Sequence, residues 1–165
     1  MESYVTRDLI AAIESAFPAA GNRRGIFGHS MGGHGALTLA LRHPDLYRSV
    51  SAFAPIVSPT RCDWGRKALA AYLGADEGRW AKHDACRLIE GGAARGRFDD
   101  ILIDQGSADS FLESQLRPGM FTAACAAAGQ KVTLRMQEGY DHSYFFIATF
   151  VAEHVAWHGG RLRGD

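Results

Sequence analysis

This 165-residue sequence has few cysteines, no excess of one charge and no long apolar run. Its three cysteines (Cys62, Cys86, Cys125) are an odd, widely spaced set without a CxxC pair, which excludes a dense disulfide framework and gives a zinc site no cysteine ligands. Eighteen basic residues balance eighteen acidic ones, so we expect neither nucleic acid nor a membrane surface as partner. No apolar run reaches the ~20 residues that span a bilayer, and residues 1–8 lack the apolar segment of a secretory signal. Free thiols suit a reducing compartment better than a disulfide framework does.

Helix-like and strand-like segments alternate along the chain, and 47% apolar content is typical of a globular protein. We expect one α/β domain over residues 1–165, with a mostly parallel sheet covered by helices on both faces. Periodicity, proline and glycine predict helices at 3–17, 31–42, 64–73, 84–90, 118–128 and 143–158, and strands at 25–28, 49–54, 100–105 and 131–137.

The segment from 24 to 37 organises these expectations. It contains a short apolar strand, a glycine-flanked turn with Ser30 at its apex, and a helix. Gly28-x-Ser30-x-Gly32 matches the G-x-S-x-G nucleophile elbow of α/β-hydrolases. Small flanking residues would let the turn close and the neighbouring strands approach, leaving the serine hydroxyl clear.

Three loops that leave strand ends carry Ser30, Asp109 and His142. Functional groups on parallel sheets gather beyond the carboxyl ends of the strands. The order Ser, Asp, His is the order of α/β-hydrolases. We therefore expect Ser30 as nucleophile, His142 as the base that then protonates the leaving group, and Asp109 as the acceptor of the other imidazole N–H. The backbone N–H of Met31 is the expected oxyanion donor.

Other residues offer alternatives to these roles. Asp104 lies within a strand and is the rival acid, and Asp141 is expected to order its own turn instead of pairing with the adjacent histidine. His29 and His34 flank the elbow and are interpreted as its packed or hydrogen-bonded neighbours. His154 and His158 form an i, i+4 pair with the spacing of metal ligands. No third ligand lies nearby in the sequence, so the pair is interpreted as part of a solvated helix face.

Three segments together are specific for one family. They are GHSMGGHGAL at 28–37, DQG at 104–106 with ADSFL at 108–112 and QLRP at 115–118, and QEGYDHSYFFI at 137–147. These resemble the S-formylglutathione hydrolase family, also called esterase D. CDWG at 62–65, followed by Lys67 and Ala68, is similar to the family as well. The late segment separates this family from generic lipases, which the elbow alone cannot do.

The resemblance implies a cytoplasmic serine thioesterase with an α/β-hydrolase fold. It implies hydrolysis of S-formylglutathione to glutathione and formate in formaldehyde detoxification, action on short-chain carboxylic esters, no metal and no cofactor, and a homodimer. The same resemblance implies Ser30, Asp109 and His142 as the triad. A related carboxylesterase acting on feruloyl or other esters, and a non-catalytic fragment that persists as a binding partner, are the alternatives.

Members of this family are considerably longer than 165 residues. By comparison with them, we expect this chain to correspond to their C-terminal portion. The N-terminal part would hold the first strands of the sheet, the loop that donates the second oxyanion N–H, and a cysteine near the site. Without it, the elbow strand is expected to lie near an exposed edge.

Overall fold

The computed structural model describes residues 1–163, and the expected domain of 1–165 therefore includes two residues outside the described range. Within that range, four strands form one parallel sheet in the order β1 (Gly25–His29), β2 (Ser49–Phe53), β3 (Ile101–Gly106) and β4 (Val132–Gln137). The α-helices are α1 (Leu9–Ala16), α2 (Met31–Arg42), α3 (Asp63–Leu73), α4 (Glu77–Trp80), α5 (Ala85–Glu90), α6 (Pro118–Ala128) and α7 (Tyr144–Leu162). Shorter turns of 3-10 helix lie at Pro59–Arg61 (η2) and Ala81–His83 (η3), and π-helical turns lie at Tyr4–Asp8 (η1) and Leu112–Leu116 (η4).

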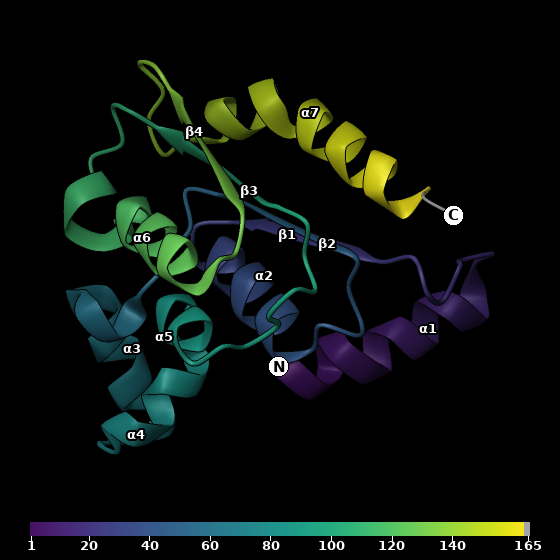
Figure 1. Cartoon of the computed structure of the whole chain (residues 1–165), viewed down its shortest axis with the longest axis horizontal. Coiled ribbons are helices and arrows are strands. Elements are labelled where there is room, and N and C mark those ends of the chain that lie inside the picture. Colours follow the sequence, from purple (N-terminus) through teal and green to yellow (C-terminus); the bar gives the residue numbers. More distant parts are fainter. Residues whose placement is uncertain (164–165) are drawn as a thin grey trace.

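Helices cover both faces of the sheet (Figure 1). Helix α7 lies across one face, whereas α2, α5 and α6 lie on the other, where the larger apolar core is formed. The β2 residues Val50 and Ala52 face this core with Leu37 and Leu41 of α2 and Phe121 of α6, and all are at most 2% exposed. The expected α/β-hydrolase arrangement, a parallel sheet between two helical layers, is confirmed.

Hydrophobic periodicity predicts a buried apolar stripe on α7, but the face that packs on the sheet differs from it. The predicted stripe consists of Phe146, Ile147, Phe150, Val151 and Val155. Phe146 is buried as predicted, but Val155 is 56% exposed, and the fully or nearly buried residues further along the helix are His154 and His158. The interpretation of this histidine pair as a solvated face is therefore wrong. The stripe prediction counted only apolar residues, whereas the sheet beneath this part of α7 presents the hydroxyls of Ser49 and Ser51 to the helix.

The edge of the sheet at β1 is open within the described range. Strand β1 pairs with β2 on one side, and no other described strand pairs with it. The side chain of Phe27 on this strand is 46% exposed. Helix α1 forms as predicted, but none of its residues is buried, and a groove of about 560 Å³ lies between its apolar residues Leu9 and Ile13 and the start of β1.

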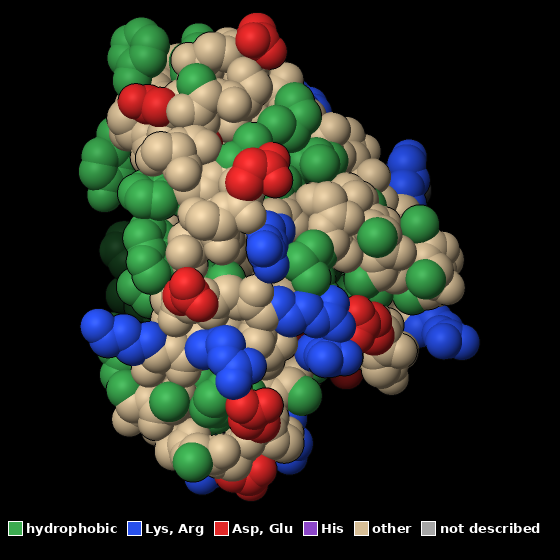
Figure 2. Space-filling view, turned by 90° about the vertical axis from the view of Figure 1, so that its left-hand side faces the viewer, with side chains coloured by type: hydrophobic (Ala, Val, Ile, Leu, Met, Phe, Trp, Pro, Cys, Tyr) green, Lys and Arg blue, Asp and Glu red, His purple; other side chains and the backbone are tan. Residues whose placement is uncertain are grey.

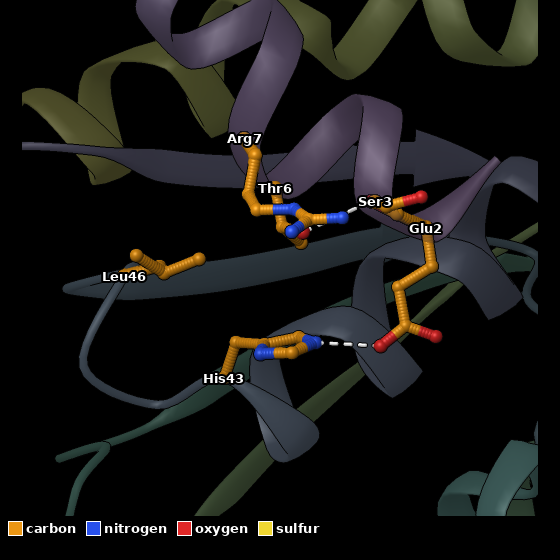
Figure 3. A pocket seen from close by; sticks show the side chains of 6 residues that line it. All are labelled: Glu2, Ser3, Thr6, Arg7, His43 and Leu46. Carbon is orange, nitrogen blue, oxygen red and sulfur yellow. Dashed lines mark hydrogen bonds and ion pairs between the residues drawn. The ribbon is translucent and has the colours of Figure 1, made fainter.

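Contacts at the N-terminus fasten the first turn to the far end of α2. Glu2 accepts a hydrogen bond from Arg42 at 2.5 Å and contacts His43 Nε2 at 2.6 Å. Figure 3 shows Glu2 and His43 on one side of a hollow of about 530 Å³ that Arg7 and Leu46 also line. His43 follows the last residue of α2 and Ser30 precedes the first, so this hollow lies a full helix length, roughly 18 Å, from the elbow. None of the helices in residues 1–163 is both long and apolar enough to cross a membrane.

Candidate active site

Ser30 occupies a strained turn between β1 and α2. Its backbone has φ 55° and ψ −114°, a combination that a residue with a side chain rarely adopts. Such conformations cost on the order of 1–3 kcal/mol and persist only where the surroundings fix them. Two backbone hydrogen bonds do so, since the N–H of Ser30 donates to Phe53 O at 2.9 Å and its carbonyl accepts from His34 N at 2.9 Å.

Gly28 permits the chain to return so tightly after the strand. A Cβ at this position would lie 2.4 Å from the carbonyl carbon and oxygen of Gly32. The expectation that the flanking residue must be small is thus correct for Gly28. It is wrong for Gly32 within the described residues, because a Cβ there would meet nothing within 4 Å.

Asp109, in the loop after β3, is buried and held by three donors. Its Oδ2 contacts His142 Nδ1 at 2.6 Å and accepts from Gln105 Nε2 at 3.1 Å, while its Oδ1 accepts from Phe111 N at 2.9 Å. The structure therefore brings Asp109 and His142 together from loops 33 positions apart in the sequence.

The loop that carries His142 lies directly on the loop that carries Asp109. Ala108 N donates to Tyr140 O at 3.0 Å, and Gly139 N donates to Ser107 Oγ at 2.9 Å. A Cβ at Gly106 would lie 2.2 Å from Tyr140 O, so only glycine admits this approach. Both loops are thereby fixed in register, and the carboxylate meets the imidazole without an intervening group.

His142 also lies against the elbow. The ring centroids of His29 and His142 are 4.5 Å apart, and His29 directly precedes Ser30 in the chain. The ring of Phe111 meets His142 edge-on at 5.2 Å, and Trp64 contacts Phe111 at 4.7 Å. Among the described residues, no hydrogen bond joins Ser30 Oγ to His142. In active sites without ligand, the hydrogen bond between nucleophile and base often forms only when substrate is bound.

The two histidines that flank the elbow are packed neighbours, as expected. Burial lowers the pKa of His29, and the charge of His142 acts in the same direction. Burial also lowers the pKa of His34, one turn into α2. Both rings are thereby favoured in the neutral state, in which neither adds positive charge beside Ser30.

The rival acid Asp104 has other partners. Its carboxylate is fully buried and accepts from Arg135 Nε at 2.5 Å and Nη2 at 2.6 Å, and His154 Nε2 lies 3.4 Å away. Burial acts to raise the pKa of Asp104, but His154 and Arg135 outweigh it and hold this pKa below its usual value. Asp141 accepts from Ser143 N at 2.9 Å and so orders its own turn, as predicted.

His154 and His158 form a buried polar chain with β2. His158 Nδ1 lies 2.6 Å from Ser49 Oγ, His158 Nε2 lies 2.8 Å from Ser51 Oγ, and the same hydroxyl lies 2.8 Å from His154 Nδ1. The sequence pattern did not predict this series of hydrogen-bonded side chains. The signal that could have found it is the i, i+4 spacing of the histidines together with two serines two residues apart on a strand, which share one face.

The face of the molecule shown in Figure 2 is the left-hand side of Figure 1, which carries α3, α6 and the loop between β4 and α7. Hydrophobic side chains gather along one margin of this face, and Lys and Arg side chains form a band across its middle.

Residues 1–163 contain no group of three or more His, Cys, Asp or Glu side chains that could hold a metal ion.

Comparisons with known proteins show the family to which the chain is related. A sequence model of a family described as "Putative esterase" matches residues 1–157. S-formylglutathione hydrolase from Mus musculus is 55% identical over 163 residues, which cover 98% of this chain and 57% of that protein, and the enzyme from Paracoccus denitrificans is 50% identical over 162 residues with the same coverage. The structure of an S-formylglutathione hydrolase from Agrobacterium tumefaciens superposes with a TM-score of 0.93 at 54% identity, covering 98% of this chain and 57% of that one. The chain thus spans 57% of the length of these curated relatives. A ferulic acid esterase at 22% identity and TM-score 0.77, with 98% and 61% coverage, shares the fold.

Proposed function

The chain belongs to the esterase family, and from that membership we propose that it is a serine hydrolase that cleaves S-formylglutathione to glutathione and formate. The observation that carries the proposal is the 2.6 Å contact between Asp109 and His142 beside the strained Ser30 turn. The proposed substrate is taken from the names of relatives that are 50–55% identical to the chain.

We assign Ser30 as the nucleophile and His142 as its base. Ser30 Oγ attacks the formyl carbon while His142 takes the hydroxyl proton. The C–S bond then breaks, His142 returns that proton to the sulfur, and glutathione leaves a formyl ester on Ser30. Water, activated by the same imidazole, hydrolyses the ester to formate and restores the serine.

Asp109 is assigned as the acid that orients the imidazole. Its Oδ2 accepts the Nδ1–H of His142, which leaves Nε2 free to act as the base and stabilises the imidazolium that forms. Met31 is the first residue of α2, and a helix leaves the first N–H groups without intrahelical acceptors. Its N–H is the proposed oxyanion donor, and a second donor is expected from the part of the relatives that this chain does not match.

Further properties implied by the family are proposals as well. These are a single α/β domain over 1–165, cleavage of short-chain esters, a homodimer, a role in formaldehyde catabolism and a cytoplasmic location. The three cysteines are all free and buried, which supports a reducing compartment. Burial raises the pKa of Cys86 and of Cys125 to about 12, so the reactive thiolate form is rare at neutral pH.

Hydrolysis of S-formylglutathione by the purified chain tests this proposal. We expect turnover that Ser30→Ala lowers on the order of a millionfold. A fluorophosphonate probe should label the parent chain and fail to label the variant. Faster cleavage of a feruloyl ester would favour the carboxylesterase alternative. A folded chain that neither hydrolyses the thioester nor reacts with the probe would contradict the proposal.

A further inference from the structure

A buried amide lies directly behind the acid–histidine pair. Gln105 is the fifth residue of β3, and its side chain is 0% exposed. Its Nε2 donates to Asp109 Oδ2 at 3.1 Å and to Gly106 O at 3.2 Å. Since both of these atoms can only accept hydrogen bonds, the amide nitrogen must face them, which fixes the orientation of the amide group.

The oxygen that Gln105 contacts is the oxygen that holds the imidazole. Asp109 Oδ2 receives both Gln105 Nε2 and His142 Nδ1, whereas Oδ1 receives the N–H of Phe111. A carboxylate held by one donor can rotate about its terminal torsion, which is broad and nearly two-fold. Because Phe111 N–H holds Oδ1 and Gln105 Nε2 holds Oδ2, each oxygen has a donor other than the imidazole, and the plane of the carboxylate is fixed independently of His142.

Packing alone does not explain glutamine at this position. Ile101 and Ile103 share its side of β3 and are fully buried in apolar surroundings. The Oε1 atom of Gln105 is buried and has no hydrogen-bond partner among the described residues, which costs stability that methionine or leucine would not lose. The amide is therefore present for what its nitrogen does.

We propose that Gln105 is a positioning residue, whose amide fixes the Asp109 carboxylate in the orientation that holds the His142 imidazole. Gln105 is fully buried and hydrogen-bonds Asp109 and not Ser30 or His142, so it acts through Asp109. The inference deepens the proposed function and rests on it for the roles of Asp109 and His142, whereas the contact itself is independent of any activity.

The test replaces Gln105 by an isostere and by a second donor. Gln105→Met keeps the volume and removes the donor. We expect kcat for S-formylglutathione to fall roughly tenfold to a hundredfold, part of the ~10⁴ that loss of the acid's function costs, with KM changed less than about threefold. Gln105→Glu places a carboxyl beside the Asp109 carboxylate, where it holds its proton and donates in place of the amide. It should therefore retain more activity than Gln105→Met, and increasingly so toward acidic pH.

Gln130→Met is the matched control. Gln130 lies in the loop between α6 and β4, and its Nε2 donates to the carbonyls of Phe98 and Lys131. This variant loses a comparable amide contact outside the site, so its kcat should equal that of the parent chain.

A second readout separates this inference from the proposed function. The Nδ1 proton of His142, bonded to Asp109, should give a far-downfield proton NMR signal, identified by its loss in His142→Gln. Gln105→Met should shift or broaden that signal, and Gln130→Met should leave it unchanged. If the parent chain lacks turnover, the proposed function fails, but the NMR comparison still decides the role of Gln105. A Gln105→Met variant with the kcat of the parent chain would overturn the inference. In a chain without turnover, an unchanged NMR signal in Gln105→Met would do the same. Higher activity in Gln105→Met than in Gln105→Glu would also overturn it.

Discussion

Lowering the pH from 7 to 4.5 should destabilise the chain through the buried His158. Burial lowers the pKa of His158 to about 4 from its usual 6.5, and the charges of His154 and Arg161 act in the same direction. A neutral His158 ring accepts at one nitrogen and donates at the other, so it fits between the hydroxyls of Ser49 and Ser51, which lie 2.6 and 2.8 Å from its two nitrogens. Protonation of His158 puts a second donor and a charge into this chain.

The sign and the magnitude follow from the pKa difference. The unfolded state binds the proton first, near pH 6.5, and the folded state binds it only near pH 4. The stabilisation is therefore complete above pH 6.5 and is lost as the pH falls through this window. Each pH unit costs at most ~1.4 kcal/mol of unfolding free energy from this one group, roughly 3 kcal/mol in all. Asp104, whose pKa lies below its usual value, stays ionised until lower pH.

Urea denaturation at several pH values between 7 and 4.5 measures this dependence. His158→Gln keeps one acceptor and one donor but cannot take up the proton. We expect it to reduce the slope of unfolding free energy against pH by up to one proton. His83→Gln is the matched control. Burial lowers the pKa of His83 as well, but this residue lies half-buried in η3 outside the polar chain, so a smaller change is expected. A parental slope in His158→Gln would refute the reasoning.

Four other substitutions test the site and the core. Asp109→Asn should lower kcat on the order of 10⁴-fold with little effect on the fold. Asp104→Asn should weaken the contact with Arg135, which keeps its pairing with Glu153, and should act chiefly on stability, by roughly 1.5–3 kcal/mol in denaturation. The reverse ranking in activity, without unfolding, would show that the acid is misassigned. Gly106→Val should separate the two loops at Tyr140 and abolish probe labelling of a chain that circular dichroism shows to be folded; normal labelling would contradict the role given to this contact. Phe121→Ala should lower the unfolding free energy by about 3–5 kcal/mol, because the ring is fully buried between α6 and the sheet, and a loss below 1 kcal/mol would contradict that packing.

The sequence alone was sufficient for the order and type of the main elements. Strand β1, helix α2 and helix α6 begin and end within one residue of the expected positions, because proline, glycine and hydrophobic periodicity act locally. The gathering of Ser30, Asp109 and His142 at one end of the sheet also followed, since parallel strands place their carboxyl ends at one edge. Their catalytic roles remain predictions.

Which partner a buried polar side chain finds was decided by the tertiary structure. Asp104 and Asp109 are both acids near the end of one strand, yet one pairs with Arg135 and the other with His142. His154 and His158 were expected in solvent, but α7 turns them toward Ser49 and Ser51. The sequence fixes the spacing of side chains along each element, but which face of a helix lies on which strand, and hence which donor meets which acceptor, depends on the packing of segments up to 109 residues apart.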